Sequence, residues 1–213
     1  MGADGRHARR GCASKGGRRT FGLWAECPIP SALGQIARRS APRAWQTRPA
    51  MADEIPAFQD LYPDHWSHCY GCGRLNEKGL HIRSFWDGEE TVAVVRPRPE
   101  HTALPGFVYG GLVASAIDCH STGSAAAAAH RAAGGTLGDG ELPRFVTGRL
   151  EVDFLEPTQV AAEMRLRSRI VEVKPRKVVV ETDLESAGRI TARGRAVLIR
   201  VPDDWEPKAG DGG

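Results

Sequence analysis

The sequence predicts an α+β fold in which an antiparallel β-sheet packs around one long helix. Three observations support this prediction. Segments with the two-residue alternation of β-strands lie on both sides of a single Ala-rich segment that is long enough for an extended helix. The strand segments after it follow one another without helices between them, and the last two are joined by the short turn Ser186-Ala187-Gly188.

Two strands are predicted before the helix. Residues 53–67 favour an arm or short helix over the core, and a Gly-rich turn follows at residues 68–79. Residues 80–84 alternate apolar and polar side chains, and residues 91–95 are rich in β-branched side chains. Because Asp87-Gly88 between them is typical of a tight turn, the pair is predicted to form a hairpin.

The one long helix is predicted from Gly110 to about Arg131. Prolines within residues 97–105 enforce a loop before it, and Gly134-Gly135 end it. Almost all of its side chains are small and apolar. This composition favours burial inside a curved sheet over a half-exposed position at the surface.

Four strands are predicted after the helix. They are Phe145 to Leu155, Glu163 to Val173, Lys177 to Leu184, and Arg189 to Val201. In the first of them, strict alternation places Thr147 on the face opposite the apolar side chains, which are Val146, Leu150, Val152 and Phe154.

Positive charge is concentrated in the first fifty residues. The 213-residue chain has a formal net charge of +3, but residues 1–50 carry ten basic and two acidic residues, and the remainder has a net charge of −5. Residues 1–50 lack helical or strand periodicity and are predicted to be disordered. The change to patterned sequence at Met51 favours an upstream extension or dispensable tail, with a transit peptide and a nucleic-acid-binding arm as alternatives.

Residues 51–213 are predicted to form one domain, with a core at about residues 65–201. No segment reaches the ~18 consecutive apolar residues of a membrane helix, and no secretory signal is visible. The mildly acidic balance of this part argues against nucleic acid as a partner. A cytoplasmic protein without a membrane span is therefore expected.

Five cysteines occur in the chain. An odd number without a secretory signal favours a reducing compartment over a disulfide framework. Cys69 and Cys72 form a C-x-x-C pair, but a structural zinc site commonly uses two such pairs, and the chain has no second one. The favoured interpretation is two thiols in a turn without metal, and a metal site is the alternative. No cofactor is predicted.

The segment from Pro105 to Asp118 carries the strongest chemical signal. Gly110 and Gly111 open the helix with backbone N–H groups that lack intrahelical acceptors and lie at the positive end of the helix dipole. Such groups suit an oxygen that develops negative charge. Asp118 follows two turns later among small apolar residues, which favours a base or nucleophile. The structural alternative is a carboxylate bonded only within its own helix, to Ser115, Ser121 or Thr122.

Two motifs resemble those of a known family. Residues 69–80 match C-x-G-C-G-x-x-N-x-x-G-L, and residues 105–118 match P-G-x-x-H-G-G-x-x-x-x-x-x-D except at the histidine. With the strand order, they resemble the hotdog-fold thioesterases of the phenylacetyl-CoA (PaaI-like) type over about residues 65–201. The resemblance implies a sheet wrapped around one central helix, and hydrolysis of an acyl-CoA substrate to a free acid and CoA.

The resemblance also implies roles for single residues. Asp118 would act as base or nucleophile, the Gly111 N–H would polarise the thioester carbonyl, and Thr147 would help to hold the attacking water. An ordinary strand threonine is the alternative for Thr147. The residues expected to bind substrate are Tyr109, Gly110 and Asn76.

Two positions depart from the family pattern. Tyr109 replaces the motif histidine, so any role of that imidazole is lost or passes to the phenol, and Ala103 stands where some members have Asn. His120 is not a substitute base, because a step of two residues turns it about 200° around the helix from Asp118. It is predicted to be a core or interface histidine.

Helix geometry predicts a shared site. Gly111 and Asp118 are about 10.5 Å apart along one helix, which is too far for one carbonyl to contact both. Acting together, they must come from different protomers, so a homodimer or a dimer of dimers is expected, as the resemblance also implies. The predicted function is acyl-CoA hydrolysis. A non-catalytic acyl-CoA-binding or scaffold module on the same fold is the alternative, favoured by the loss of the histidine at Tyr109.

Overall fold

The computed structural model describes residues 55–202 and 204–205, and the predictions for residues 1–50 lie outside them. Two short 3-10 helices, η2 (Phe58–Leu61) and η3 (Asp64–Trp66), come first. They are followed by β1 (Ser84–Asp87), β2 (Glu90–Val95) and the helix α1 (Gly110–Ala132). The last four elements are β3 (Phe145–Phe154), β4 (Met164–Lys174), β5 (Lys177–Ser186) and β6 (Arg189–Arg200).

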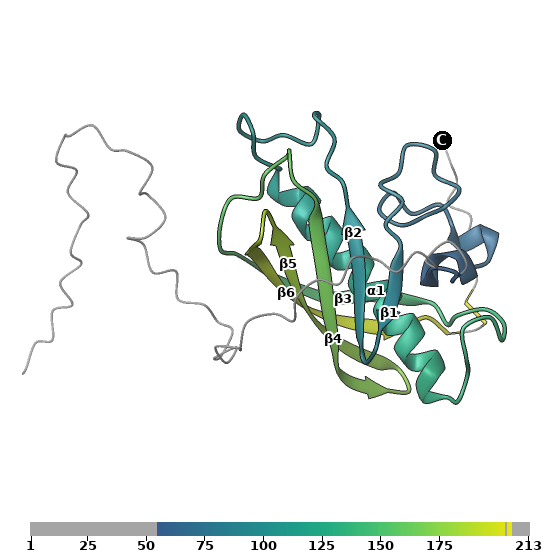
Figure 1. Cartoon of the computed structure of the whole chain (residues 1–213). Helices are drawn as coiled ribbons and strands as arrows, with labels where there is room; N and C mark the ends of the chain where they lie inside the picture. The colour runs from purple at the N-terminus through teal and green to yellow at the C-terminus, as the bar shows by residue number, and fades with distance from the viewer. Residues whose placement is uncertain (1–54, 203, 206–213) are drawn as a thin grey trace, which may run out of the picture. The chain divides into compact units, whose positions relative to one another are not determined.

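One six-stranded antiparallel sheet packs around α1 (Figure 1). The strand order is β1-β2-β4-β5-β6-β3, so β1 lies at one edge and β3 at the other. Alternate residues of the central strands point toward the helix and are fully buried, among them Met164, Leu166, Leu184 and Ala192. The predicted α+β class is confirmed, and the arrangement is the hotdog fold that the resemblance implied.

The helix α1 matches the predicted segment closely. Tyr109 is its N-cap, and Gly134, with a φ of +87°, follows its last turn in a conformation that favours glycine. Its middle is buried on nearly all sides, including every residue from Cys119 to Ala128. No helix among residues 55–202 is long and apolar enough to cross a membrane.

The first strand begins later than the sequence pattern indicates. Residues 80–84 were expected to form it, but β1 is Ser84–Asp87. His81 has a φ of +50°, which interrupts the extended backbone. The Leu80 and Ile82 N–H groups instead donate hydrogen bonds to the carbonyls of the turn at residues 70–71. Alternation at residues 80–84 therefore reflects packing against that turn.

A bulge interrupts the pairing of β3 with β6. Thr147 pairs with Leu198 and Arg149 pairs with Val197, so Gly148 is an extra residue on β3. A Cβ atom at Gly148 would lie 2.9 Å from a side chain of β6. Because so close an approach is not tolerated by a larger residue, glycine suits the bulge.

The bulge overturns the predicted faces of β3. Residues paired across an antiparallel ladder share a face, and Thr147, Leu150 and Val152 all pair with β6 residues that point toward α1. Val146 lies on the opposite face and is 47% exposed. The prediction that Thr147 lies opposite Leu150 and Val152 was wrong, because the extra residue reverses the alternation.

A buried polar cluster connects α1 to the β1–β2 hairpin. His120 is fully buried, with its Nδ1 atom 2.8 Å from Ser84 Oγ and its Nε2 atom 3.5 Å from Thr91 Oγ1. Gln59 donates a hydrogen bond to Ser84 Oγ and accepts one from the Ser84 N–H. Its side chain passes the helix at Gly123, where a Cβ atom would lie 2.4 Å from Gln59 Nε2. The prediction that His120 is a core histidine is confirmed.

Burial of His120 makes the fold sensitive to acid. Desolvation lowers the pKa of His120 from 6.5 to about 4. Between these values the unfolded chain binds more protons than the folded chain, so the free energy of unfolding falls as the pH falls. From about pH 7.5 to about pH 5, this histidine alone is expected to lower it by about 2 kcal/mol. Denaturant unfolding at a series of pH values measures the change.

The His120→Gln variant is the control for this prediction. Glutamine keeps polar atoms for Ser84 and Thr91 but does not titrate. From about pH 7.5 to about pH 5, the unfolding free energy of this variant should therefore fall by about 2 kcal/mol less than that of the original chain. His101, whose pKa is also lowered by burial, contributes with the same sign to both proteins. Equal pH dependence in the two proteins would contradict the prediction.

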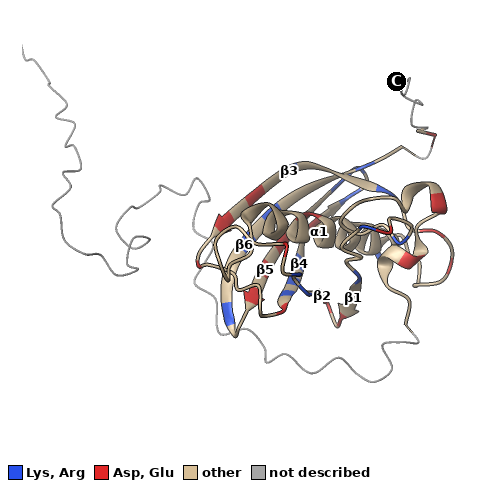
Figure 2. Cartoon of the chain, turned by 90° about the horizontal axis from the view of Figure 1, so that it is seen from above, with Lys and Arg blue, Asp and Glu red and all other residues tan. Residues whose placement is uncertain are grey.

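The outer face of the sheet carries paired charges of both signs. Arg169 and Arg195 both contact Glu181, and Arg193 Nε lies 3.0 Å from Asp183 Oδ1. Figure 2 shows basic and acidic residues interspersed along these strands. Exposed pairs of this kind typically stabilise a fold by less than about 1 kcal/mol each. These pairs balance positive and negative charge on the face of the sheet that points away from α1.

Candidate active site

Asp118 lies two turns into α1, half-buried, on the side of the helix that faces β3. Its carboxylate accepts a hydrogen bond from the Thr147 hydroxyl. Burial raises the pKa of Asp118 above its ordinary value, and the bond from Thr147 opposes that rise. The result is a carboxylate with few polar neighbours that one hydroxyl holds in position, which suits a base or a nucleophile.

The structure contradicts the alternative in which the Asp118 carboxylate is bonded only within its own helix. The Ser121 hydroxyl pairs with Thr182 of β5, 3.1 Å away. The Thr122 hydroxyl donates to the backbone carbonyl of Asp118, 3.0 Å away, and not to its side chain. The hydrogen bond that orients the carboxylate comes from β3, through the bulge that turns Thr147 inward.

Thr147→Val is expected to reduce activity about tenfold, because a hydrogen bond to a charged group contributes about 1.5–3 kcal/mol and valine keeps the shape without the hydroxyl. The loss should fall on kcat, since Thr147 contacts the carboxylate that is expected to act as base or nucleophile. Steady-state hydrolysis assays measure it. Thr147→Ser, which retains the hydroxyl, is the matched control and should keep most of the activity. Equal activity in the valine and serine variants would contradict the prediction.

The N-terminus of α1 offers backbone donors. Tyr109 is the N-cap of α1, and its side chain makes no capping hydrogen bond. The first N–H groups of the helix therefore remain able to bind an oxygen. The absence of a side chain at Gly111 gives room to the Tyr109 ring, since a Cβ atom there would lie 2.6 Å from it. The Phe154 ring lies against Gly110. Two aromatic side chains thus pack close to the first residues of the helix.

The described chain does not bring every predicted site residue together. Asp118 and Thr147 are in contact, whereas Gly111 is two turns of α1 away from Asp118. The side chain of Asn76 is engaged in its own turn, where it donates to the His68 carbonyl and accepts from the Lys78 N–H. Substrate binding by Asn76, Gly110 and Tyr109 stays a prediction.

Three thiols meet next to Asp118. The Sγ atoms of Cys69, Cys72 and Cys119 all lie within 4.8 Å of one another. Negative charge on Cys69 adds to the rise in the pKa of Asp118. Cys119 was missed as a partner of the C-x-x-C pair because it lies about fifty residues away in a helix. Only its position next to Asp118 marked it in the sequence.

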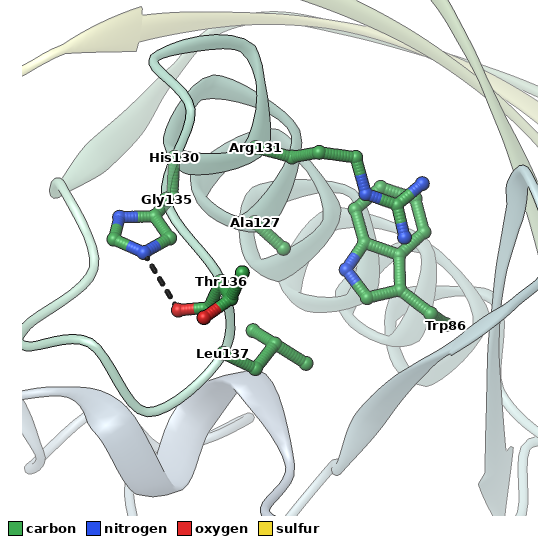
Figure 3. A pocket seen from close by; sticks show the side chains of 7 residues that line it. All are labelled: Trp86, Ala127, His130, Arg131, Gly135, Thr136 and Leu137. Atoms are coloured by element: carbon green, nitrogen blue, oxygen red, sulfur yellow. Dashed lines mark hydrogen bonds between the residues drawn. The ribbon is translucent and has the colours of Figure 1, made fainter.

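A separate pocket of about 330 Å³ lies at the other end of α1 (Figure 3). The residues that line it are Trp86, Ala127, His130, Arg131, Gly135, Thr136 and Leu137. The Arg131 guanidinium covers the Trp86 ring at 3.5 Å from its centroid. Because His130 is twelve residues beyond Asp118, about 18 Å along the helix, this pocket is distinct from the carboxylate.

Comparison with known proteins connects this geometry to a family. The family model described as "Thioesterase superfamily" matches residues 105–192, which include Gly111, Asp118 and Thr147. A thioesterase superfamily protein from Shewanella loihica PV-4 is 47% identical, over 65% of this chain and 98% of that chain, with a TM-score of 0.50. The chain belongs to the thioesterase superfamily.

Other solved structures similar to this superfamily member are more distant. The PaaI protein from the phenylacetic acid degradation operon of E. coli is 14% identical over 58% of this chain and 81% of that chain, with a TM-score of 0.48. The smu.793 protein of Streptococcus mutans UA159, bound to acetyl CoA, is 12% identical over 60% and 96%, also with a TM-score of 0.48. No curated protein matches the chain. PaaI is therefore only a distant structural neighbour.

Proposed function

We propose that this thioesterase superfamily member hydrolyses acyl-CoA thioesters to a free acid and CoA. The observation that carries the proposal is the half-buried Asp118 carboxylate, held by the Thr147 hydroxyl on the central helix of the fold. A carboxylate so placed either activates a water molecule or attacks the thioester carbonyl itself. In both routes the carbonyl–sulfur bond breaks, an oxygen replaces the sulfur, and CoA leaves as the thiol. In the second route, water then hydrolyses the anhydride between the acyl group and Asp118, which releases the acid and restores the carboxylate.

The Gly111 N–H completes the proposed chemistry by binding the thioester carbonyl oxygen. Attack on the carbonyl places negative charge on this oxygen, and a donor at the positive end of the α1 dipole stabilises that charge more than it stabilises the neutral carbonyl. Tyr109, 37% exposed and at the same helix end, is proposed to contact substrate in place of the family histidine. Gly110 and Asn76 are also proposed to contact the substrate.

The two halves of the site are proposed to come from different protomers. Within one chain, Gly111 and Asp118 are too far apart to reach one carbonyl. The strand that holds Thr147 is an edge strand, and among the described strands β3 pairs with β6 alone. Exposed apolar side chains at both ends of β3, Val146 at 47% and Phe154 at 50%, support its burial against a second copy. A two-fold axis along this edge generates two shared sites.

The function is tested with a series of acyl-CoA substrates that differ in chain length and aromatic character. A thiol-reactive dye reports release of CoA, and mass spectrometry of the acid product shows which bond was cut. We expect release from at least one class of substrate, and loss of that release in Asp118→Asn. An aromatic substrate hydrolysed best would support the finer PaaI-like assignment suggested by the two motifs.

The second candidate is a non-catalytic acyl-CoA-binding module on the same fold. The observation that favours it is Tyr109, because a family position that carries histidine here carries a phenol. The same substrate series separates the two functions. Saturable binding of acyl-CoA by calorimetry, without release of thiol from any substrate, would replace the enzymatic proposal with this one.

A further inference from the structure

The C-x-x-C turn is held in shape by its own backbone. The Gly73 N–H donates to the Cys69 carbonyl at 2.8 Å, and the Leu80 N–H donates to the Tyr70 carbonyl at 2.8 Å. Gly73 has no space for a side chain, since a Cβ atom there would lie 2.5 Å from the Cys69 nitrogen. The turn therefore presents two sulfurs from a fixed backbone.

The helix α1 brings a third sulfur to this turn. Cys119 is 7% exposed and Cys72 is 5% exposed, so two of the three thiols are buried. Cys119 reaches the turn because Gly71 lacks a side chain, since a Cβ atom at Gly71 would lie 2.2 Å from Cys119 Sγ. The three sulfurs therefore meet because Gly71 leaves room for Cys119 of the helix, and Gly73 leaves room for the turn to close on the Cys69 backbone.

The spacing of the sulfurs fits one metal ion. Two sulfurs bound to one zinc at about 2.3 Å in tetrahedral geometry lie about 3.8 Å apart, and Cys69 Sγ lies 3.8 Å from Cys119 Sγ. The third sulfur lies within 4.8 Å of both. Soft thiolate ligands select zinc and similar ions over magnesium or calcium.

The charges around the cluster fit a divalent ion. Three thiolates with one divalent cation leave a net charge of −1, and the Arg144 guanidinium is close enough to Cys72 to act on it as a positive charge. The Nε and Nη1 atoms of Arg144 are buried without a hydrogen-bond partner. Binding the cation displaces the protons that remain on the three thiols.

We propose that Cys69, Cys72 and Cys119 bind one zinc ion, which ties the turn before β1 to α1 at the residue after Asp118. Zinc with three protein ligands takes a fourth from solvent, and Cys69, the least buried of the three, gives solvent access. The site goes beyond the proposed hydrolase activity and is independent of it. It also changes the favoured interpretation of the sequence, which was a C-x-x-C turn without metal.

The test measures metal on the full chain kept reduced with a phosphine. Elemental analysis of protein grown with zinc should give about one zinc per chain. Cys72→Ser is expected to weaken zinc binding by more than ~100-fold. Gly71→Ala, which retains every thiol but displaces Cys119, should weaken it similarly. Cys27→Ser is the matched control, because it removes a thiol that is not one of the three proposed ligands, and it should bind zinc as the original chain does.

A second measurement needs no variant. Metal-free protein titrated with cadmium should show sulfur-to-cadmium absorption that saturates at one ion per chain. Zinc should protect Cys69, Cys72 and Cys119, and no other cysteine, from alkylation, as mapped by peptide mass spectrometry. A reduced chain that takes up neither zinc nor cadmium would overturn the proposal. Metal that stays bound in both Cys72→Ser and Gly71→Ala would overturn it equally.

Discussion

Asp118→Asn is expected to lower kcat for acyl-CoA hydrolysis by more than ~100-fold, which is the range for loss of a catalytic base. Asparagine has the size of aspartate and can still accept a hydrogen bond from Thr147, but it can neither take a proton from water nor attack a carbonyl. Binding should change less than turnover, because the substrate carbonyl is proposed to be held by the Gly111 N–H. Initial rates of thiol release over a range of substrate concentrations separate the two effects.

Asp153→Asn is the matched control for this experiment. Asp153 follows Val152 on β3, so it points away from α1, and the substitution makes the same change of charge on the outer face of the sheet. Its activity should stay near that of the original chain. Thermal unfolding of both variants shows whether either has lost the fold. A folded Asp118→Asn variant with near-normal turnover would remove this residue from the mechanism.

Removing the Gly111 N–H is expected to cost about 10²–10³ in kcat, as loss of one oxyanion donor does. Gly111→Pro removes this donor at a first-turn position, where a helix tolerates proline. Gly111→Ala keeps the donor and adds one methyl group, which the exposed Tyr109 ring can avoid by turning aside. The difference in kcat between the two variants therefore isolates the hydrogen bond. Equal activity in the two would exclude this N–H from catalysis.

Asp118→Asn and Gly111→Pro together test whether the site is shared between two protomers. In a mixed dimer of Asp118→Asn and Gly111→Pro chains, one site has both defects and the other has neither. Purified mixed dimers of these two inactive chains should thus recover about half of the original activity. Co-expression with two different affinity tags gives purified mixed dimers for the assay. Mixed dimers without activity would mean that each chain holds a complete site.

Most of the fold was predicted from local sequence patterns. Five strands and the helix α1 were located from alternation, β-branched composition and terminal glycines, which act over a few residues. The prediction failed at His81 and at Gly148. The positive φ of His81 and the extra residue at Gly148 both interrupt alternation, and neither is visible in side-chain polarity. The faces of β3 could not be assigned without its partner strand.

The candidate site was only partly readable from the sequence. Asp118 stood out because a carboxylate in an apolar helix is costly to bury. Its contact with Thr147 depends on how β3 lies over α1, and the contact of Cys119 with the C-x-x-C turn depends on a missing side chain at Gly71. Both are consequences of three-dimensional packing between segments that are distant in the chain.

The polar cluster around His120 also determines the direction in which Asp118 points. From Ala125 to Ala129 the helix surface is a uniform layer of methyl groups, so packing of this part alone fixes the angle of α1 about its own axis only weakly. His120 pairs with Ser84 of β1 and Thr91 of β2, and a rotation of α1 would leave these buried groups without partners. A residue that takes no part in the chemistry thus aligns the helix, and with it the carboxylate on the helix's other side.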